Sequence, residues 1–425
     1  MPDNTHIEMI ESLAERVPAG AKPPELDLDR LRRNAEELSK LLAWNPSVHT
    51  SHFFSVRWNA LETVLRPALE KVNRTSRTAS DPDDLRWLRD NMPLLWAELW
   101  NTRNAFKQHK HLPHVRTPNG VTIPRAAALA ESYLHAVEFN FSQTSFVAYL
   151  SAFQKTTVLK FRELWAVLPA MELVLLEQIA VRAKRFLANS EPAAIGICVR
   201  SLREVNQAQW RELLEQHIAF DPVLRQDPAG AYPRMDFESR NLYREKLVRI
   251  AERSDFTEVE VAHEALALAR RARQQNIEDP RLALRESHIG YYLAGEGVSQ
   301  LCERVRFRPS LIQRIRSFLR SHPDEFYLPG IEVLTFGIMS VIVLLLTSRF
   351  TPPGLILLSM LVLLLPCSQS AVQLMNYLAT ALLRPEILPK LDFSEGIPDD
   401  CTTLVAVPAL LLSENQVRRL AQDLE

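Results

Sequence analysis

Motifs that would mark a self-contained soluble enzyme are missing from this 425-residue sequence. It has no Gly-x-Ser-x-Gly nucleophile elbow, no Gly-rich phosphate loop and no cluster of metal-ligating side chains. Cysteine is scarce, and the four present stand far apart, without a Cys-x-x-Cys pair or histidines at ligand spacing: Cys198, Cys302, Cys367 and Cys401. This usage fits a reducing cytoplasm and argues against structural zinc. A soluble hydrolase is therefore a poor interpretation.

An excess of positive charge is also lacking. The 50 Lys and Arg residues against 51 Asp and Glu give a formal net charge of -1, so no global surplus of cations exists to displace counterions from phosphates. We predict that the protein does not bind nucleic acid. The start, MPDNTHIEMIESLAERVP, is polar and has no apolar segment typical of a signal peptide, so we expect the N-terminal part to stay in the cytoplasm.

What the sequence does contain is one long apolar stretch, residues 328–383. Its first half, 328–346, is predicted to be a transmembrane helix, because about 20 apolar residues at roughly 1.5 Å each span a hydrocarbon core of about 30 Å. Glu332 lies within about a turn of Pro329 and Gly330, so we interpret it as snorkelling to the headgroups or capping the helix, in preference to a functional acid inside the membrane.

The second half of the stretch is predicted to be a kinked helix that runs through Pro366 to about Leu383, after a chain reversal at 347–354 that contains two prolines and a glycine. Beyond the kink, four polar residues share one helical face: Gln369, Gln373, Asn376 and Thr380. Interfacial or bundle packing is the first interpretation of this face, and a path for a polar polymer is the second.

The cations around this hairpin predict its orientation. They lie at its two ends, whereas the turn carries only Arg349: Arg304, Arg306, Arg308, Arg314, Arg316, Arg320, Arg384 and Lys390. The positive-inside rule then places both termini in the cytoplasm. Residues 311–319, LIQRIRSFL, have the pattern of a basic amphipathic helix suited to anionic lipids of the inner leaflet.

Before the hairpin the pattern is helical. We predict helices at 28–42, 56–72, 85–106 and across 124–188, the last ending in a central core helix kinked at Pro169. Two Ser/Thr-x-x-Glu capping boxes, at Ser201 and Thr257, are expected to open further helices. No strand-rich region appears before residue 400.

Several polar clusters in these helical regions have a structural and a functional interpretation. Asp81, Asp83 and Asp84 precede a helix and are interpreted as caps and not as a metal motif. The histidines at 109, 111 and 114 are expected in a solvated loop, with metal binding as the lesser alternative. Asp227 and Asp236, in a turn-rich connector with nearby tyrosines and arginines, suggest a structural Asp–Arg network, and an acid/base pair is the other possibility.

The end of the sequence predicts a short apolar strand at 403–408 and a helix opened by the capping box Ser413–Gln416. A buried strand, a loop and a capped helix form the opening unit of a nucleotide-binding α/β sheet. One strand cannot make a sheet, so we expect either docking on another chain or truncation.

Four ordered blocks resemble the cyclic β-1,2-glucan synthase family: FRELWAVLPAMELVLLEQI, DPAGAYPRMDFESRNLYREKLVRIAERS, ESHIGYYLAGEG, and IPDDCTTLVAVPALL preceded by LPKLDF. The resemblance runs from about Leu112 to the end. It implies an inner-membrane protein with a cytoplasmic helical region, membrane helices, a processive UDP-glucose glycosyltransferase domain and a phosphorylase-like domain that closes the glucan ring.

The family's acid-x-acid metal motif, catalytic base and acceptor site would lie downstream of the first strand. The resemblance therefore implies no catalytic residue and no cofactor in this chain, with UDP-glucose and a divalent metal expected only in a complete catalytic domain. Only the strand end, Val407, Pro408 and Ala409, carries over as positions that would approach UDP.

Taken together, the sequence predicts a mainly α protein: helical regions at 1–120 and 121–320, a transmembrane hairpin at 321–385, and at 386–425 a linker with the first βα unit of an incomplete α/β glycosyltransferase sheet. We expect the membrane-anchoring, scaffolding portion of a synthase of this family, inactive alone because its catalytic core is absent. Its expected partners are inner-leaflet anionic lipids, the catalytic portion or a downstream gene product, and β-1,2-glucan. The alternative is a free-standing, membrane-tethered helical interaction protein.

Overall fold

The computed structural model describes residues 27–42, 47–50, 53–78, 81–108, 111–116, 122–189, 191–275, 278–311, 313–314, 318–319, 322–346, 352–382, 388–399, 402 and 413–424. These residues are mainly α-helical, with one small sheet. Their contacts divide the chain into two compact units: residues 1–226 with 250–267, and residues 227–249 with 268–425. The division into four regions made from the sequence remains a prediction.

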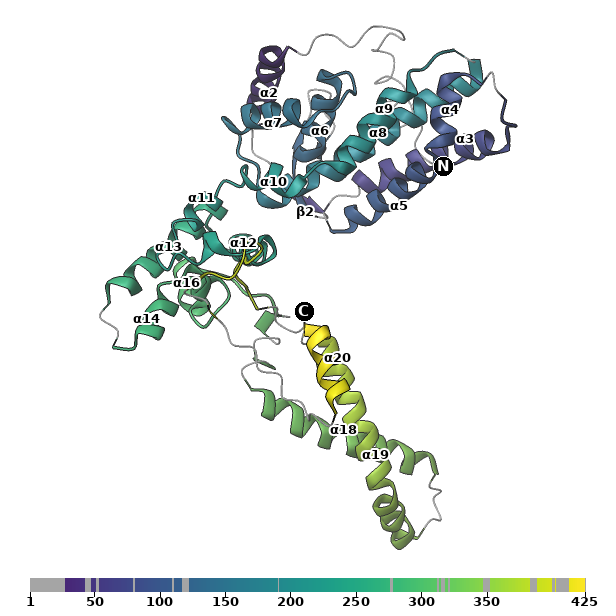
Figure 1. Ribbon diagram of the computed structural model, residues 1–425. Helices are drawn as coiled ribbons and strands as arrows, with labels where there is room; N and C mark the ends of the chain where they lie inside the picture. Colours follow the sequence, from purple (N-terminus) through teal and green to yellow (C-terminus); the bar gives the residue numbers. More distant parts are fainter. Residues whose placement is uncertain are drawn as a thin grey trace. The chain divides into compact units, whose positions relative to one another are not determined.

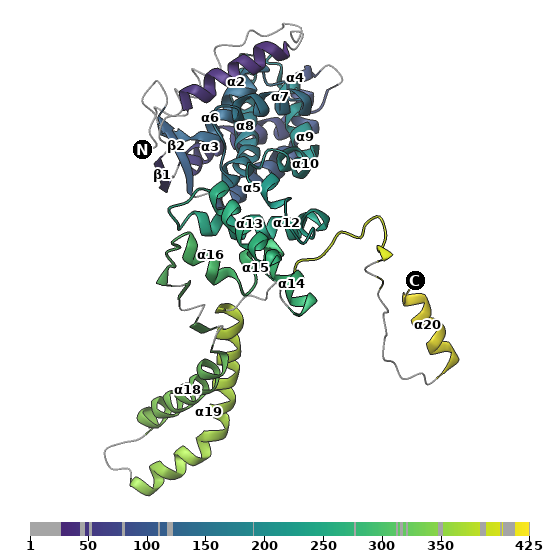
Figure 2. The ribbon, with the colours of Figure 1, turned by 90° about the vertical axis from the view of Figure 1, so that its left-hand side faces the viewer.

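The first unit is a helical bundle with a small sheet on it (Figures 1 and 2). Its elements are α2 (Leu28–Leu42), β1 (Ser47–Thr50), α3 (Phe53–Arg74), α4 (Asp83–Asp90), α5 (Met92–Gln108), β2 (His111–Arg116), β3 (Thr122–Pro124), α6 (Arg125–Ala136), α7 (Gln143–Gln154), α8 (Phe161–Asn189), α9 (Ile195–Gln207), α10 (Trp210–Glu215) and α11 (Asp221–Leu224). The helix predicted at 28–42 is confirmed. The one predicted at 56–72 continues through Pro67, and the one at 85–106 is divided between α4 and α5.

Helix α8 is the centre of this unit and contacts α3, α5, α6 and α9 (Figure 1). It is long and apolar enough to cross a membrane, yet almost all of it is buried inside the protein, including Leu164, Met171 and Leu175. Pro169 lies within the helix without ending it. The prediction of a buried core helix is confirmed.

Buried ion pairs attach neighbouring helices to α8. The guanidinium of Arg57 on α3 donates through Nε to Oε1 of Glu177 on α8 at 2.8 Å, and it also pairs with Glu131 on α6. Arg125, at the start of α6, donates in the same way to Glu163 on α8 at 2.8 Å. Burial lowers the pKa of Arg57, but the charges of Glu177 and Glu131 outweigh burial and leave that pKa raised, so the guanidinium stays charged. Three helices are thereby held in register by charge.

The small sheet corrects one expectation from the sequence. Strands β1, β2 and β3 form an antiparallel sheet in that order, with Val48 opposite Pro113 and Val115 opposite Ile123. His114 lies on β2 and is buried, with Nδ1 2.7 Å from the carbonyl oxygen of Leu112. The solvated loop predicted for this position is wrong, because strand pairing satisfies the backbone of a proline-containing segment that has no helical periodicity.

Local capping signals had mixed outcomes. Thr257 and Glu260 form the predicted capping box, with the Thr257 N–H donating to Oε2 of Glu260 at 2.7 Å and the Glu260 N–H donating to Oγ1 of Thr257 at 3.3 Å. The box predicted at Ser201 is wrong: this residue lies inside α9, and its hydroxyl donates to the Phe139 carbonyl at 2.6 Å. The Ser201 hydroxyl therefore makes a tertiary hydrogen bond and does not cap a helix.

Asp84 lies in the first turn of α4 but caps the start of a different helix, α9. Its carboxylate accepts the N–H groups of Ala193 and Ile195, both at 2.7 Å, at the start of α9. Helix α4 itself begins after Pro82 without a side-chain cap. Asp83 and Asp84 do lie in the first turn of α4, where carboxylates complement the helix dipole.

The second unit contains short helices, a long hairpin and a final helix: η1 (Tyr232–Arg234), α12 (Phe237–Ala251), the end of α13 (Glu258–Gln274), α14 (Pro280–Glu286), α15 (Ile289–Leu293), α16 (Val298–Arg304), α18 (Pro323–Leu346), α19 (Pro353–Leu382) and α20 (Glu414–Leu424). The N–H of Gln416 donates to Oγ of Ser413 at 3.3 Å, as the predicted cap of α20 requires. The strand predicted at 403–408 lies outside the described residues.

Helices α18 and α19 lie side by side and are both long and apolar enough to cross a membrane (Figure 2). They pack through Met339, Val343 and Cys367, while most other side chains of the pair are exposed. Helix α19 continues through Pro366, as predicted. Helix α18 begins at Pro323, so Glu332 lies in its third turn and not one turn from its start. In the basic segment 311–319, positions 312 and 315–317 lie outside the described residues, so its amphipathic character remains a prediction.

Replacing Arg57 by Met should destabilise the first unit strongly. Its side chain is 6% exposed, and removing it leaves the carboxylates of Glu131 and Glu177 without their cation. Breaking a buried pair in this way costs about 3–5 kcal/mol. Thermal unfolding of the full chain, followed by circular dichroism, measures the effect. As a matched control, Arg32→Met removes a surface pair with Asp29 from a side chain that is 50% exposed and should cost about 0–1 kcal/mol. Equal losses for the two variants would contradict the assigned role.

Candidate functional site

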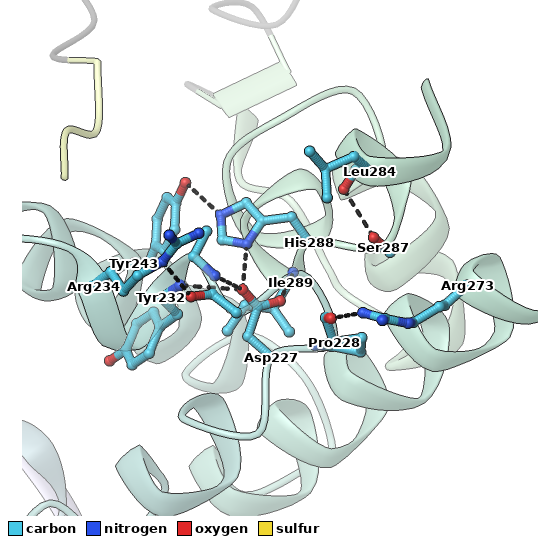
Figure 3. Close-up of polar contacts among 12 residues, drawn as sticks. Asp227, Pro228, Tyr232, Arg234, Tyr243, Arg273, Leu284, Ser287, His288 and Ile289 are labelled. Carbon is cyan, nitrogen blue, oxygen red and sulfur yellow. Dashed lines mark hydrogen bonds and ion pairs between the residues drawn. The ribbon is translucent and has the colours of Figure 1, made fainter. Parts of the chain in front are cut away.

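The carboxylate of Asp227 is the polar centre of the second unit (Figure 3). It is buried in the loop between α11 and η1. Oδ2 accepts the N–H groups of Ala231 at 3.0 Å and Tyr232 at 3.1 Å, and Oδ1 accepts the N–H of Ile289 at 3.0 Å. Oδ2 also lies 2.8 Å from Nδ1 of His288. One carboxylate therefore fixes both a turn and the start of α15, which lie about 60 residues apart in the sequence.

The pKa of Asp227 reflects this arrangement. Burial raises it, but the hydrogen bond and charge of His288, together with the N–H groups of Ile289 and Tyr232, outweigh burial and hold the pKa below its ordinary value. The group is therefore an anion at neutral pH. At Asp227 the structure shows an Asp–His contact, made by a side chain about 60 residues away in the sequence.

The other ring nitrogen of His288 faces a tyrosine. Nε2 lies 3.2 Å from the hydroxyl of Tyr243 on α12. Burial, with a further contribution from the charge of Asp227, raises the pKa of Tyr243 to about 12. Gly290 is required here, since a Cβ at this position would lie 2.3 Å from the Tyr243 hydroxyl and 2.4 Å from Nε2 of His288.

An Asp–His pair of this kind can orient an imidazole for proton transfer. Here, however, Nε2 is engaged by a phenol that keeps its proton at neutral pH and is then a weak nucleophile. Neighbouring contacts also hold the loop in place. Arg244 donates through Nε to the Tyr232 hydroxyl at 3.0 Å. Figure 3 shows the bond from Arg273 to the Pro228 carbonyl. The geometry therefore favours the structural interpretation of the connector over an acid/base pair.

The same connector also binds the segment that follows the hairpin, at residues 390–392. The Asp392 N–H donates to the Arg234 carbonyl at 2.8 Å, the Asp236 N–H donates to the Lys390 carbonyl at 3.3 Å, and Met235 pairs with Leu391 as an antiparallel bridge. We call residues 234–236 and 390–392 the linker clamp.

Side chains reinforce the linker clamp. The Lys390 N–H donates to Oγ of Ser239 at 2.8 Å, and the Lys390 ammonium lies 3.4 Å from Oδ2 of Asp236. Oδ1 of Asp236 accepts the Ser239 N–H at 2.9 Å, near the start of α12. The chain that follows α19 is thus fixed to the Asp227 connector by backbone and side-chain bonds.

A second group with shifted pKa values lies in the first unit. Burial and the nearby charge of Glu98 raise the pKa of Glu172 on α8 to about 8, and burial raises the pKa of Glu98 on α5. Thr102 donates to Oε2 of Glu172 at 3.2 Å. Glu172 therefore holds a proton at neutral pH, which permits two acids to share a helical core. The described residues contain no group of three or more His, Cys, Asp or Glu placed to hold a metal ion.

The site residues predicted from the sequence divide into two sets. Val407, Pro408 and Ala409 lie outside the described residues, so their proposed approach to UDP stays a prediction. Asp227 and Asp236 lie in the same connector, but their partners differ: Asp227 contacts His288, and Asp236 pairs with Lys390. Sequence analysis missed His288. The block ESHIGYYLAGEG contained it, but no spacing rule connects positions about 60 residues apart.

Comparison with known proteins adds a family relationship. No protein-family model matches the chain. It is 26% identical to the cyclic beta-(1,2)-glucan synthase NdvB of Rhizobium meliloti (strain 1021), over an alignment of 427 residues that covers 80% of this chain and 15% of that protein. The chain is therefore distantly homologous to a portion of that synthase and spans only a small part of its length. The family resemblance inferred from the four blocks is confirmed.

Substituting Asp227 by Asn should loosen the connector and the start of α15 together. The amide keeps one acceptor oxygen but presents an NH₂ group to donors that need a carboxylate, and each unpaired buried donor costs about 1–3 kcal/mol. We expect faster hydrogen exchange at the amides of Tyr232 and Ile289, measured by mass spectrometry on the full chain. Asp83→Asn, at an exposed surface pair, is the control and should leave this exchange unchanged.

The pH dependence follows from the sign of the Asp227 shift. Since its folded pKa is lowered, its stabilisation is complete above the ordinary value of about 4 and is lost as the pH falls through the lowered pKa. Protection at Tyr232, corrected for intrinsic exchange, should therefore fall as the pH drops below about 4. If the Asp227→Asn variant kept wild-type protection at the amides of Tyr232 and Ile289, Asp227 would not be the group that holds the turn and the start of α15 together.

Proposed function

We propose that this chain forms the membrane-anchored helical part of a β-1,2-glucan synthase, with α18 and α19 spanning the inner membrane of a bacterium. The observation that carries the proposal is the exposed apolar surface of α18 and α19 in a chain homologous to part of such a synthase. Helix α8 offers the internal contrast, because it is comparably apolar but buried in protein. An apolar hairpin left uncovered by protein is favourable in lipid.

Charge supports an orientation with both ends of the hairpin in the cytoplasm. Arg304, Arg306, Arg308 and Arg314 are exposed just before α18, and Lys390 is exposed after α19. Cations flanking membrane helices remain on the cytoplasmic side and attract anionic lipids of the inner leaflet. On this proposal the first unit, and the helices of the second unit that precede α18, lie on the cytoplasmic side.

The scaffolding role would follow from the linker clamp. It fixes the chain leaving α19 to the Asp227 connector, so the residues that follow begin from a defined point beside the membrane. In the proposed assembly those residues lead toward the portion that transfers glucose from UDP-glucose. We propose that UDP-glucose and a divalent metal bind to that portion and not to this chain. The growing β-1,2-glucan and the catalytic portion are the partners we propose.

The orientation predicts opposite labelling of two introduced cysteines. In a background with Cys302 and Cys401 replaced by Ser, Gly354→Cys at the start of α19 should react with a membrane-impermeant maleimide in intact cells. Ser394→Cys, beyond the linker clamp, should react only after the membrane is permeabilised. Both positions are exposed, and nothing lies within 4 Å of a Cβ at Gly354. Labelling of both cysteines in intact cells, or of neither, would contradict a hairpin with cytoplasmic ends.

The functional test is incorporation of labelled glucose from UDP-glucose into glucan. We expect membranes with this chain alone to be inactive and membranes that also contain a glucosyl-transfer portion of the same family to be active. Replacing Asp236 by Lys in the clamp, which puts a like charge beside Lys390, should lower incorporation while the chain remains in alkali-washed membranes. Activity from this chain alone would contradict the scaffold proposal, and inactivity of the pair would favour a free-standing tethered interaction protein.

A further inference from the structure

Two glutamines on the polar face of α19, Gln369 and Gln373, point away from α18. The residues of α19 buried against its partner recur at Cys367, Ala371 and Met375. Gln369 and Gln373 each lie two residues from two of these, about 200° around the helix at roughly 100° per residue. Both side chains are exposed. The hairpin therefore leaves these two glutamines uncovered.

Most of the polar face has partners within the hairpin, but its two glutamines do not. The Tyr327 hydroxyl of α18 donates to Oδ1 of Asn376 at 2.7 Å, and Thr380 donates to the Asn376 carbonyl at 2.9 Å. For Gln369 and Gln373 the described residues supply no hydrogen bond. Each glutamine amide has two donors and an acceptor oxygen that remain available.

The depth of these amides follows from the hairpin itself. From Tyr327 to Leu346, α18 spans about 30 Å, the thickness of a hydrocarbon core, so the Tyr327–Asn376 pair marks the cytoplasmic boundary. Gln373 and Gln369 lie three and seven residues nearer the turn than Asn376, which places them about 5 and 10 Å inside that boundary. On the same face, nearer the turn, Val362 and Leu365 are apolar and exposed. The face is thus polar only in the cytoplasmic half of the span.

Unbonded amides are unfavourable in hydrocarbon, and lipid tails cannot bond them. Interhelical hydrogen bonds between such side chains are a common means of association in membranes. A second copy of the chain inserts with the same orientation, so a two-fold axis along the membrane normal places identical residues at equal depth. Because an amide both donates and accepts, two identical glutamine faces are complementary, whereas two faces of like charge would repel.

Resting on the proposed membrane placement, we propose that Gln369 and Gln373 of α19 bind the same two residues of a second copy of this chain. The occupant of the polar face is then another α19 helix, packed through the face opposite α18. Between the glutamines and the turn of the hairpin, the two helices would meet through Val362 and Leu365 or diverge into lipid. The pairing would place two helical scaffolds side by side at one membrane surface.

Disulfide cross-linking in membranes tests the geometry. The full chain carries Gln373→Cys, with Cys302 and Cys401 replaced by Ala and the buried Cys198 and Cys367 kept. Oxidation with copper phenanthroline should yield a cross-linked dimer. The matched control is Leu374→Cys, at almost the same depth but about 100° around the helix, which should yield at least tenfold less dimer. Equal yields would overturn the proposed face.

Association without introduced cysteines provides a second measurement. Two differently tagged copies of the full chain are expressed together and recovered from membranes in mild detergent. Gln369→Leu with Gln373→Leu should reduce co-recovery about tenfold. The control, Ser370→Ala, removes an exposed hydroxyl that bonds the Pro366 carbonyl of its own helix and should change nothing. Unchanged co-recovery of the double variant would overturn the proposal.

Remaining outcomes separate this inference from the proposed function. If wild-type copies stay in alkali-washed membranes but are not co-recovered, the pairing fails and the anchoring role stands. If alkali extracts the chain, the membrane placement itself fails, and the pairing with it. If a water-soluble maleimide labels Gln373→Cys in membranes before oxidation, the face lines a water-filled path, and pairing through it is excluded.

Discussion

The buried guanidinium of Arg57 is the charge on which the first helical unit depends. A cation in a protein interior persists only with paired anions and satisfied hydrogen bonds, and here the anions come from α6 and α8. Arg125 and Glu163 repeat the arrangement nearer the start of α8. These pairs explain how a helix as apolar as α8 belongs to a protein core: Glu163 and Glu177 are paired with arginines on neighbouring helices that also cover its apolar surface. In α18 and α19 no such set of charged neighbours exists among the described residues, and the apolar surface stays exposed.

In the second unit a buried anion, the carboxylate of Asp227, has the role that the buried cation Arg57 has in the first unit. Asp227 collects three backbone donors and a histidine, and these contacts fix the turn from which the linker clamp is built. Asp227 therefore fixes the turn and the start of α15, and the residues that follow the turn hold the chain that leaves the hairpin. The consequence for the proposed synthase is mechanical: the position of whatever follows residue 392 would depend on a network whose members are dispersed over more than 150 residues of sequence.

Sequence patterns identified elements more securely than partners. The helix at 28–42, the core helix at 161–189 and the capping box at Thr257 depend on local periodicity or on residues three apart, and each was confirmed. Ser201 has the same local pattern as Thr257, but its hydroxyl holds the turn at Phe139 instead. Asp84 illustrates the same point, since it lies at the start of one helix and caps another. His114 was misplaced because a strand pairs with distant residues that periodicity does not reveal.

By itself the sequence determined the helical class, the apolar hairpin and the relationship to a glucan synthase, because hydrophobic periodicity, run length and ordered sequence blocks are properties of neighbouring residues. Only the tertiary structure decided which long apolar helix is covered by protein, which histidine meets Asp227, and which face of α19 is left open. Those outcomes depend on contacts between residues far apart in the chain, and their energies arise from burial and hydrogen-bond geometry that exist only once the helices have packed.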